Sequence, residues 1–143
     1  SPTAWDKGSL SDEHVPLVFY EPQLLNPQKI HEVVSQIDIL PTLAGMVHQP
    51  YTNTTLGRDV LNSKNRTDAA FIIHHDEGRI GVVTNDYYFV KNLRITKEEL
   101  MPINSDNLDI NTRQKDSVEN KLSQLTSAIY ETAKWMLVNN KKK

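Results

Sequence analysis

The chain has 143 residues, the size of one domain, and its 16 basic and 18 acidic residues leave a formal net charge of −2. Because basic and acidic residues are nearly equal in number, the net charge gives no indication of a nucleic-acid or anionic-membrane partner. The chain has no cysteine, which excludes disulfides, thiolate zinc sites and cysteine nucleophiles. No apolar run approaches the ~20 residues that a membrane-spanning helix needs.

The first apolar run covers residues 15–20 (VPLVFY) and ends at Glu21-Pro22. Its apolar residues are continuous and do not alternate with polar ones, which is typical of a strand buried on both faces of a parallel α/β sheet. Pro16 fits the first residues of such a strand. The sequence therefore predicts a buried strand here, preceded by a polar loop.

A short buried helix is predicted within residues 33–47. Asp38 is a suitable N-cap because its side-chain oxygens can accept an unpaired amide of the first turn. Pro41 then falls in that turn, where a missing N–H costs little. A catalytic carboxylate at Asp38 is the less favoured alternative. The apolar residues at helical spacing are Leu40, Leu43, Ala44 and Val47.

Three β-rich runs follow at residues 69–74, 80–84 and 87–90, and turn-forming residues separate them. They predict a small antiparallel meander. The sequence His74-His75-Asp76-Glu77 suggests a metal cluster, but adjacent side chains of a strand point to opposite faces. An ordinary charged hairpin is the favoured interpretation.

Residues 93–116 are polar and predict irregular structure. An amphipathic helix is then predicted over about 117–139, with residues 116–120 supplying cap candidates. Its apolar stripe most simply packs on the meander, and Lys141, Lys142 and Lys143 are interpreted as a solubilising tail. The stripe residues are Val118, Leu122, Leu125, Ile129, Ala133 and Met136.

Four blocks, in this order, resemble the sulfatases and their relatives in the alkaline phosphatase superfamily. Residues 15–22 resemble the "VPLIIYxP" strand, residues 34–43 (VSQIDILPTL) the "vsqiDilPTL" segment, and residues 56–61 (LGRDVL) the "lGrdLl" segment. Residues 71–89 are similar to the terminal sheet of the group. The sequence of the second block is most similar to that of lipoteichoic acid synthase-like phosphoglycerol transferases.

The resemblance implies an α/β fold: the C-terminal portion of an alkaline-phosphatase-like α/β sandwich, with a small antiparallel sheet and a long C-terminal helix. It divides the chain into residues 1–62, the end of the α/β core, and residues 63–143, a C-terminal subdomain. The start at Ser1 instead of Met suggests a processed or excised piece.

The resemblance also implies chemistry. The complete enzyme would attack a phosphate or sulfate ester with a hydroxyl nucleophile activated by a divalent metal ion (Mn, Mg, Ca or Zn). None of the family's catalytic or metal-ligand positions has a match in this chain. Lys7 stands near the position of a substrate-facing lysine in sulfatases. His14 stands directly before the strand, at a substrate-side or structural position in relatives, where a cation would suit an ester anion.

The expected protein is therefore the C-terminal part of an extracytoplasmic, membrane-anchored sulfatase or phosphoglycerol transferase. The expected role of this part is scaffolding, and its expected partner is the rest of the parent chain. Self-association is a further expectation because an unpaired strand edge invites a partner. No nucleic-acid partner is expected. The alternative is a non-catalytic binding or interaction module that retains the fold.

Overall fold

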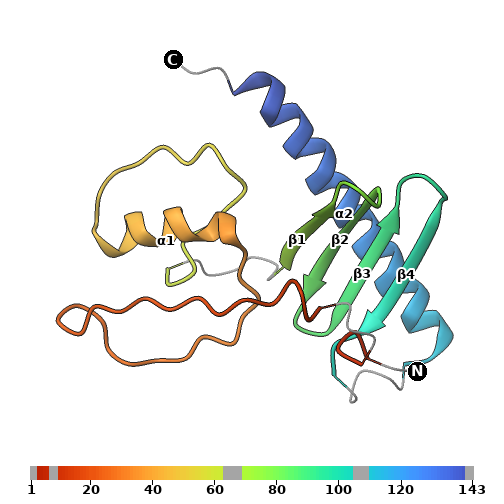
Figure 1. Cartoon of the computed structure of the whole chain (residues 1–143), viewed down its shortest axis with the longest axis horizontal. Helices are drawn as coiled ribbons and strands as arrows, with labels where there is room; N and C mark the ends of the chain where they lie inside the picture. The colour runs from red at the N-terminus through yellow and green to blue at the C-terminus, as the bar shows by residue number, and fades with distance from the viewer. Residues whose placement is uncertain (1–2, 7–9, 63–68, 105–109, 141–143) are drawn as a thin grey trace.

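The computed structural model describes residues 3–6, 10–62, 69–104 and 110–140. The chain forms a mixed α/β structure in which a small sheet lies against a long C-terminal helix (Figure 1). In chain order the elements are the 3-10 turn η1 (Gln36–Asp38), α1 (Ile39–Met46), β1 (Ala69–His74), β2 (Arg79–Thr84), β3 (Tyr87–Asn92), β4 (Lys97–Pro102) and α2 (Thr112–Asn139).

The four strands form an antiparallel sheet in the order β1-β2-β3-β4. Phe71 pairs with Val82, and Val82 pairs with Phe89, so these three side chains share one face. The predicted meander is confirmed. The fourth strand was not predicted, because Lys97–Pro102 lies in the stretch expected to be irregular.

Helix α2 covers one face of the sheet (Figure 1). Val82, Phe89 and Leu122 are buried between the two layers. The prediction that the helix packs its apolar stripe on the meander is confirmed for Val118, Leu122, Leu125 and Ile129, while Ala133 and Met136 are not part of this core. The partly buried residues around this core are Phe71, Tyr87, Leu100, Val118, Leu125 and Ile129.

Helix α2 begins at Thr112, earlier than the predicted start near residue 117. The N-cap is Asn111. Its side chain accepts the backbone N–H of Gln114 at 2.9 Å, while the Gln114 side chain accepts the backbone N–H of Asn111 at 3.1 Å. This reciprocal capping box satisfies two amides that the first turn leaves unpaired. The predicted end near Asn139 is confirmed.

The opposite face of the sheet is covered by the first residues of the chain. Ala4 and Leu10 are buried in a second core cluster with Tyr88, Val90 and Met101. The backbone N–H of Ala4 donates to the carbonyl of Pro102 at 2.8 Å. These first residues belong to the predicted 1–62 unit, yet their core contacts are with strands of the predicted 63–143 unit.

The strand predicted at residues 15–20 is wrong for this chain. The segment is extended but forms no strand, and Val15, Val18 and Tyr20 are 61%, 78% and 87% exposed. A strand persists only where its backbone N–H and C=O groups pair with a neighbour. Among the described residues, no backbone hydrogen bond joins this segment to a strand. Most of its apolar side chains therefore face solvent, and Phe19 is half-buried.

Neither helix in the described part of the chain combines the length and apolar character needed to cross a bilayer.

Candidate functional site

Asp38 is the buried acid of the segment that carries the family resemblance, with 4% of its surface exposed. One carboxylate oxygen accepts the backbone N–H of Ser35 at 2.9 Å, and the other accepts the backbone N–H of Arg58 at 2.8 Å. Asp38 stands at the N-cap of α1, but its side chain makes no capping bond to that helix. The predicted capping bond is therefore wrong: the carboxylate ties η1 to a loop 20 residues away.

Thr42 makes a parallel connection one turn further along α1. Its buried hydroxyl donates to the carbonyl of Asp38 at 2.7 Å and accepts the backbone N–H of Val60 at 3.1 Å. The hydroxyl therefore uses both its donor and its acceptor capacity. Asp38 and Thr42 together hold the loop around Arg58 against the start of α1.

Gly57 and Arg58 complete this unit from the loop side. A Cβ at Gly57 would lie within 1.9 Å of the carbonyl oxygen of Ile37, so the close approach requires glycine. The Arg58 guanidinium donates to the carbonyl of Val33 at 3.0 Å. We call residues 33–62 the α1 unit.

The apolar side of α1 faces outward, so the predicted burial of this stripe is wrong. Leu40, Leu43 and Val47 are 58%, 40% and 57% exposed. The helix instead packs its Pro41 and Thr42 side against the loop, because that side carries the buried hydroxyl that the loop amide needs.

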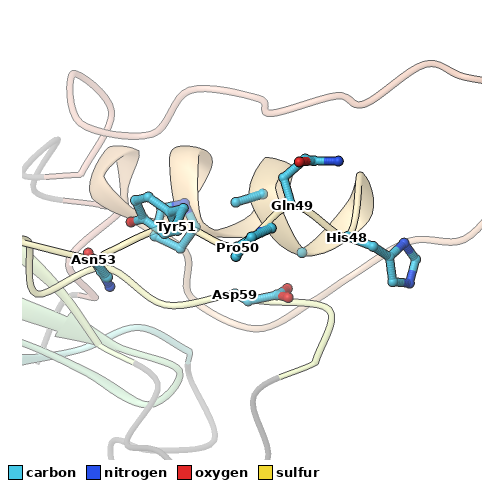
Figure 2. A pocket seen from close by; sticks show the side chains of 9 residues that line it. His48, Gln49, Pro50, Tyr51, Asn53 and Asp59 are labelled. Atoms are coloured by element: carbon cyan, nitrogen blue, oxygen red, sulfur yellow. The ribbon is translucent and has the colours of Figure 1, made fainter.

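A shallow depression of about 590 Å³ lies beside α1 (Figure 2). His48 lies at one end of it and Asn53 at the other. The Asp59 side chain packs where a Cβ on Gly45 would fall, within 1.9 Å of one carboxylate oxygen. The lining residues are Pro41, Ala44, Gly45, His48, Gln49, Pro50, Tyr51, Asn53 and Asp59.

Two of the polar side chains that line this depression, Asp59 and Asn53, bond to the loop itself. Asp59 accepts the backbone N–H of Leu61 at 3.0 Å and the side-chain amide of Asn62 at 2.8 Å. Asn53 donates from its side chain to the carbonyl of Gly57 at 2.6 Å. Asp59 and Asn53 therefore hold one wall of the depression in place, and the other polar side chains that line it are His48, Gln49 and Tyr51.

His14, one of the two predicted substrate-side residues, lies on the surface. Its backbone N–H donates to the carbonyl of Leu10 at 3.0 Å. Its ring meets Trp5 edge to face, with 5.4 Å between the ring centroids. His14 does not line the depression beside α1. Lys7, the other predicted residue, lies outside the described residues.

The sequence His74-His75-Asp76-Glu77 lies at the β1–β2 turn, as the hairpin interpretation predicted. His74 Nε2 lies 3.0 Å from Glu13 Oε1, and Glu77 pairs with Arg79. Tyr88 is buried nearby, and its burial raises the pKa of its phenol above the ordinary value. The carboxylates of Glu13 and Glu77 raise that pKa further, while Arg79 opposes them.

A side-chain cluster that sequence reasoning missed joins α2 to the sheet. Lys91 Nζ lies 2.8 Å from Glu98 Oε1. The Ser123 hydroxyl of α2 donates to the same Glu98 oxygen at 2.8 Å, and Lys91 lies 3.5 Å from Ser123. The cluster is a polar bridge between layers.

The family resemblance implies a divalent metal ion in the complete enzyme. Within the described ranges, no three His, Asp or Glu side chains gather closely enough to hold an ion. The described residues alone therefore do not form the metal site that the resemblance implies.

No protein-family model matches the chain, and no curated protein matches it either.

Proposed function

We propose that this chain is the C-terminal part of a sulfatase-like or phosphoglycerol-transferase enzyme with an alkaline-phosphatase-like α/β sandwich. In the complete protein a metal-activated hydroxyl attacks a phosphate or sulfate ester. The present residues supply scaffold and one wall of the substrate cleft, and the parent enzyme is extracytoplasmic and membrane-anchored.

The observation that carries the proposal is the bonding within the α1 unit. Two sequence blocks of the resemblance, residues 34–43 and 56–61, are separate in the chain but bind each other. Asp38 and Thr42 of the first block accept the amides of Arg58 and Val60 of the second. A structural unit that needs both sequence motifs explains why the two motifs would occur together in a family.

The exposed apolar surface also supports a larger parent. Val18 and Tyr20 of the extended segment and Leu40 of α1 are each more than half exposed. We infer that these exposed side chains belong to a contact site, as large exposed apolar patches generally do. The rest of the parent chain is the occupant that the proposal assigns to it, and the exposed segment would then become the buried strand that its composition predicts.

His14 and Lys7 are proposed to face the ester anion in the complete enzyme. His14 is exposed at the start of the extended segment, where its ring lies edge to face against Trp5. Facing a cleft formed with the parent would require the ring to leave that contact. A protonated imidazole would there add a charge-assisted hydrogen bond to the anion.

The alternative function is a non-catalytic binding module. The residues encoded upstream of Ser1 distinguish the two. A Thr, Ser or Cys nucleophile motif with an Asp-His pair supports the enzyme, and a start codon directly before Ser1 supports the module.

The activity test uses these 143 residues with an aryl phosphate and an aryl sulfate, in Mn²⁺, Mg²⁺, Ca²⁺ and Zn²⁺. We expect no turnover, because no nucleophile or metal-ligand position of the family is matched. Metal-dependent hydrolysis by this chain alone would refute the scaffold role. In the complete enzyme, His14→Gln should lower kcat/KM roughly 10-fold, as expected for one lost charge-assisted hydrogen bond, with Glu21→Gln as a neutral control.

A further inference from the structure

The segment from Val15 to Glu21 is extended and has no partner strand among the described residues (Figure 1). In the described part of the chain, no backbone–backbone hydrogen bond involves residues 15–20. The next bonds along the chain are local: the backbone N–H groups of Leu24 and Leu25 donate to the carbonyl of Glu21, at 3.1 Å and 2.8 Å. Several consecutive residues therefore present backbone donors and acceptors that can pair with another molecule.

The side chains of this segment are unequally exposed on its two sides. Side chains of an extended chain alternate in direction, so Val18 and Tyr20 share one side. They are 78% and 87% exposed. On the other side, Leu17 is 45% exposed and Phe19 is half-buried. A molecule that binds the segment therefore meets Val18 and Tyr20 first.

The residues before this segment are fixed to the sheet, and we call residues 3–6 and 10–14 the strap. Leu10 is buried in the second core cluster. The backbone N–H of Ala4 donates to the carbonyl of Pro102 at the end of β4, at 2.8 Å. Glu13 lies 3.0 Å from His74 at the end of β1. Because β1 and β4 are the two edge strands of the sheet, these contacts hold the strap at both edges.

We propose that the peptide bond between Tyr20 and Glu21 is a proteolytic processing site for an endopeptidase with an apolar primary pocket. A bound extended peptide pairs its main chain like an added strand, and its alternate side chains enter pockets. Tyr20 fills the primary pocket and Val18 the pocket for the second residue before it. Water adds across the bond, so that Tyr20 gains a terminal carboxylate and Glu21 a terminal ammonium group.

The strap stays on the sheet after this cleavage. Its contacts through Ala4, Leu10 and Glu13 all precede the cut, and the strands that they touch follow it. None of these contacts needs the peptide bond after Tyr20. The cleaved protein is therefore a molecule of two pieces, residues 1–20 and residues 21–143.

Exposure alone would not select this bond, because other apolar side chains are as exposed. Trp135 and Leu137 are 64% and 85% exposed but belong to α2. A helix must open locally before its backbone can pair with an enzyme. Leu24 is 74% exposed but lies in the turn that follows Glu21. The bond after Tyr20 needs no such opening, and exposed segments of this kind are preferred sites of cleavage.

This inference does not rest on the proposed enzyme family, since it uses only the extended segment and the strap. A parent that covers the segment, as proposed above, would protect the bond, so the site is open in this chain by itself. A failed activity or upstream-sequence test leaves the inference standing. An uncut bond would in turn say nothing about ester chemistry.

The test is limited digestion of the 143-residue chain with chymotrypsin, whose primary pocket is apolar, followed by mass spectrometry. We expect residues 1–20 and 21–143 to accumulate before any cut in α2. Tyr20→Ala should slow this cut roughly 100-fold, since the primary pocket loses its aromatic ring. Glu21→Pro should block it while keeping Tyr20. Trp135→Ala is the matched control, an exposed aromatic residue in a helix, and should be cut after Tyr20 at the parent rate.

Gel filtration of the cleaved protein tests whether the strap is retained. Residues 1–20 should elute together with residues 21–143. Leu10→Ala should weaken this association roughly 30-fold or more, as for the loss of other buried leucine contacts. Val15→Ala is the control, because Val15 belongs to the same piece but is 61% exposed; its piece should be retained as in the parent.

Circular dichroism before digestion checks that each variant is folded. An intact bond after Tyr20 at a time when α2 has been cut would overturn the processing site, as would a parent rate in Tyr20→Ala. Release of residues 1–20 from the cleaved parent protein would overturn the retained strap.

Discussion

Asp38 is a buried carboxylate whose two oxygens each accept a backbone N–H, from Ser35 and from Arg58. A buried amide that loses its acceptor is left without a hydrogen bond to offset the free energy of removing it from water. This cost is larger when the lost partner is charged. The acid therefore has a structural task that needs no catalytic explanation.

Asp38→Ala is expected to destabilise the α1 unit by about 3 kcal/mol, since it leaves two amides unpaired. The measurement is amide hydrogen exchange: the Ser35 and Arg58 N–H groups should exchange far faster than in the parent protein. Asp12→Ala is the control, because Asp12 is exposed. Unchanged protection of the Arg58 amide in Asp38→Ala would show that the carboxylate does not hold the loop.

At the scale of elements, the polar bridge between α2 and the sheet depends on ionised Glu98. The hydrogen bond from Lys91 is the largest cause that holds the pKa of Glu98 below its ordinary 4.5, and the bond from Ser123 adds to it, while partial burial opposes both. Because the folded state lowers this pKa, the bridge contributes stability above about pH 4.5. That contribution is lost as the pH falls through the lowered value.

Glu98→Gln should therefore destabilise the protein at pH 7 and lose its effect toward pH 3. The side chain is 30% exposed, so the difference at pH 7 should not exceed about 1 kcal/mol. Urea unfolding at a series of pH values measures it. Glu131→Gln is the matched control, since Glu131 also pairs with a lysine but is 66% exposed. A constant difference between Glu98→Gln and the parent across this range would contradict the assignment.

The elements predicted correctly are those whose hydrophobic pattern matches a packing partner within this chain. The meander follows from β-rich runs separated by turns, and α2 follows from one apolar stripe that finds the sheet beside it. Strand β4 was missed because Lys97, Glu98 and Glu99 are poor strand formers. Its place is decided instead by pairing with β3, including Phe89 opposite Leu100.

The incorrect predictions concern apolar residues that could be buried only against a strand or helix that the described residues do not supply. Residues 15–20 are apolar enough for a central strand, but among the described residues no strand pairs with them. The apolar stripe of α1 (Leu40, Leu43 and Val47) is likewise exposed and not buried as predicted. Of the predicted site, His14 was located on the surface and Lys7 lies outside the described residues, so the candidate site remains a prediction from resemblance.

At the scale of the whole molecule, the sheet has a different cover on each face. Helix α2 covers one face through Leu122, and the first residues of the chain cover the other through Ala4 and Leu10. Removal of the second cover would expose Tyr88, Val90 and Met101 to water.

Leu10→Ala should lower the free energy of unfolding by about 2–4 kcal/mol, as for other buried leucines. Thermal and urea unfolding measure the loss. Leu24→Ala is the matched control: Leu24 is 74% exposed, against 4% for Leu10, so its truncation should change stability by less than about 0.5 kcal/mol. Equal effects of the two truncations would show that the first residues do not stabilise the sheet.

The hydrogen bond from Ala4 to Pro102 also has a consequence for biosynthesis. A ribosome adds about 5–20 residues per second, so roughly 5–20 s pass between the synthesis of Ala4 and that of Pro102 at the end of β4. During that interval Leu10 has no sheet to cover, and a nascent chain halted before β4 should be a better chaperone client than the finished protein.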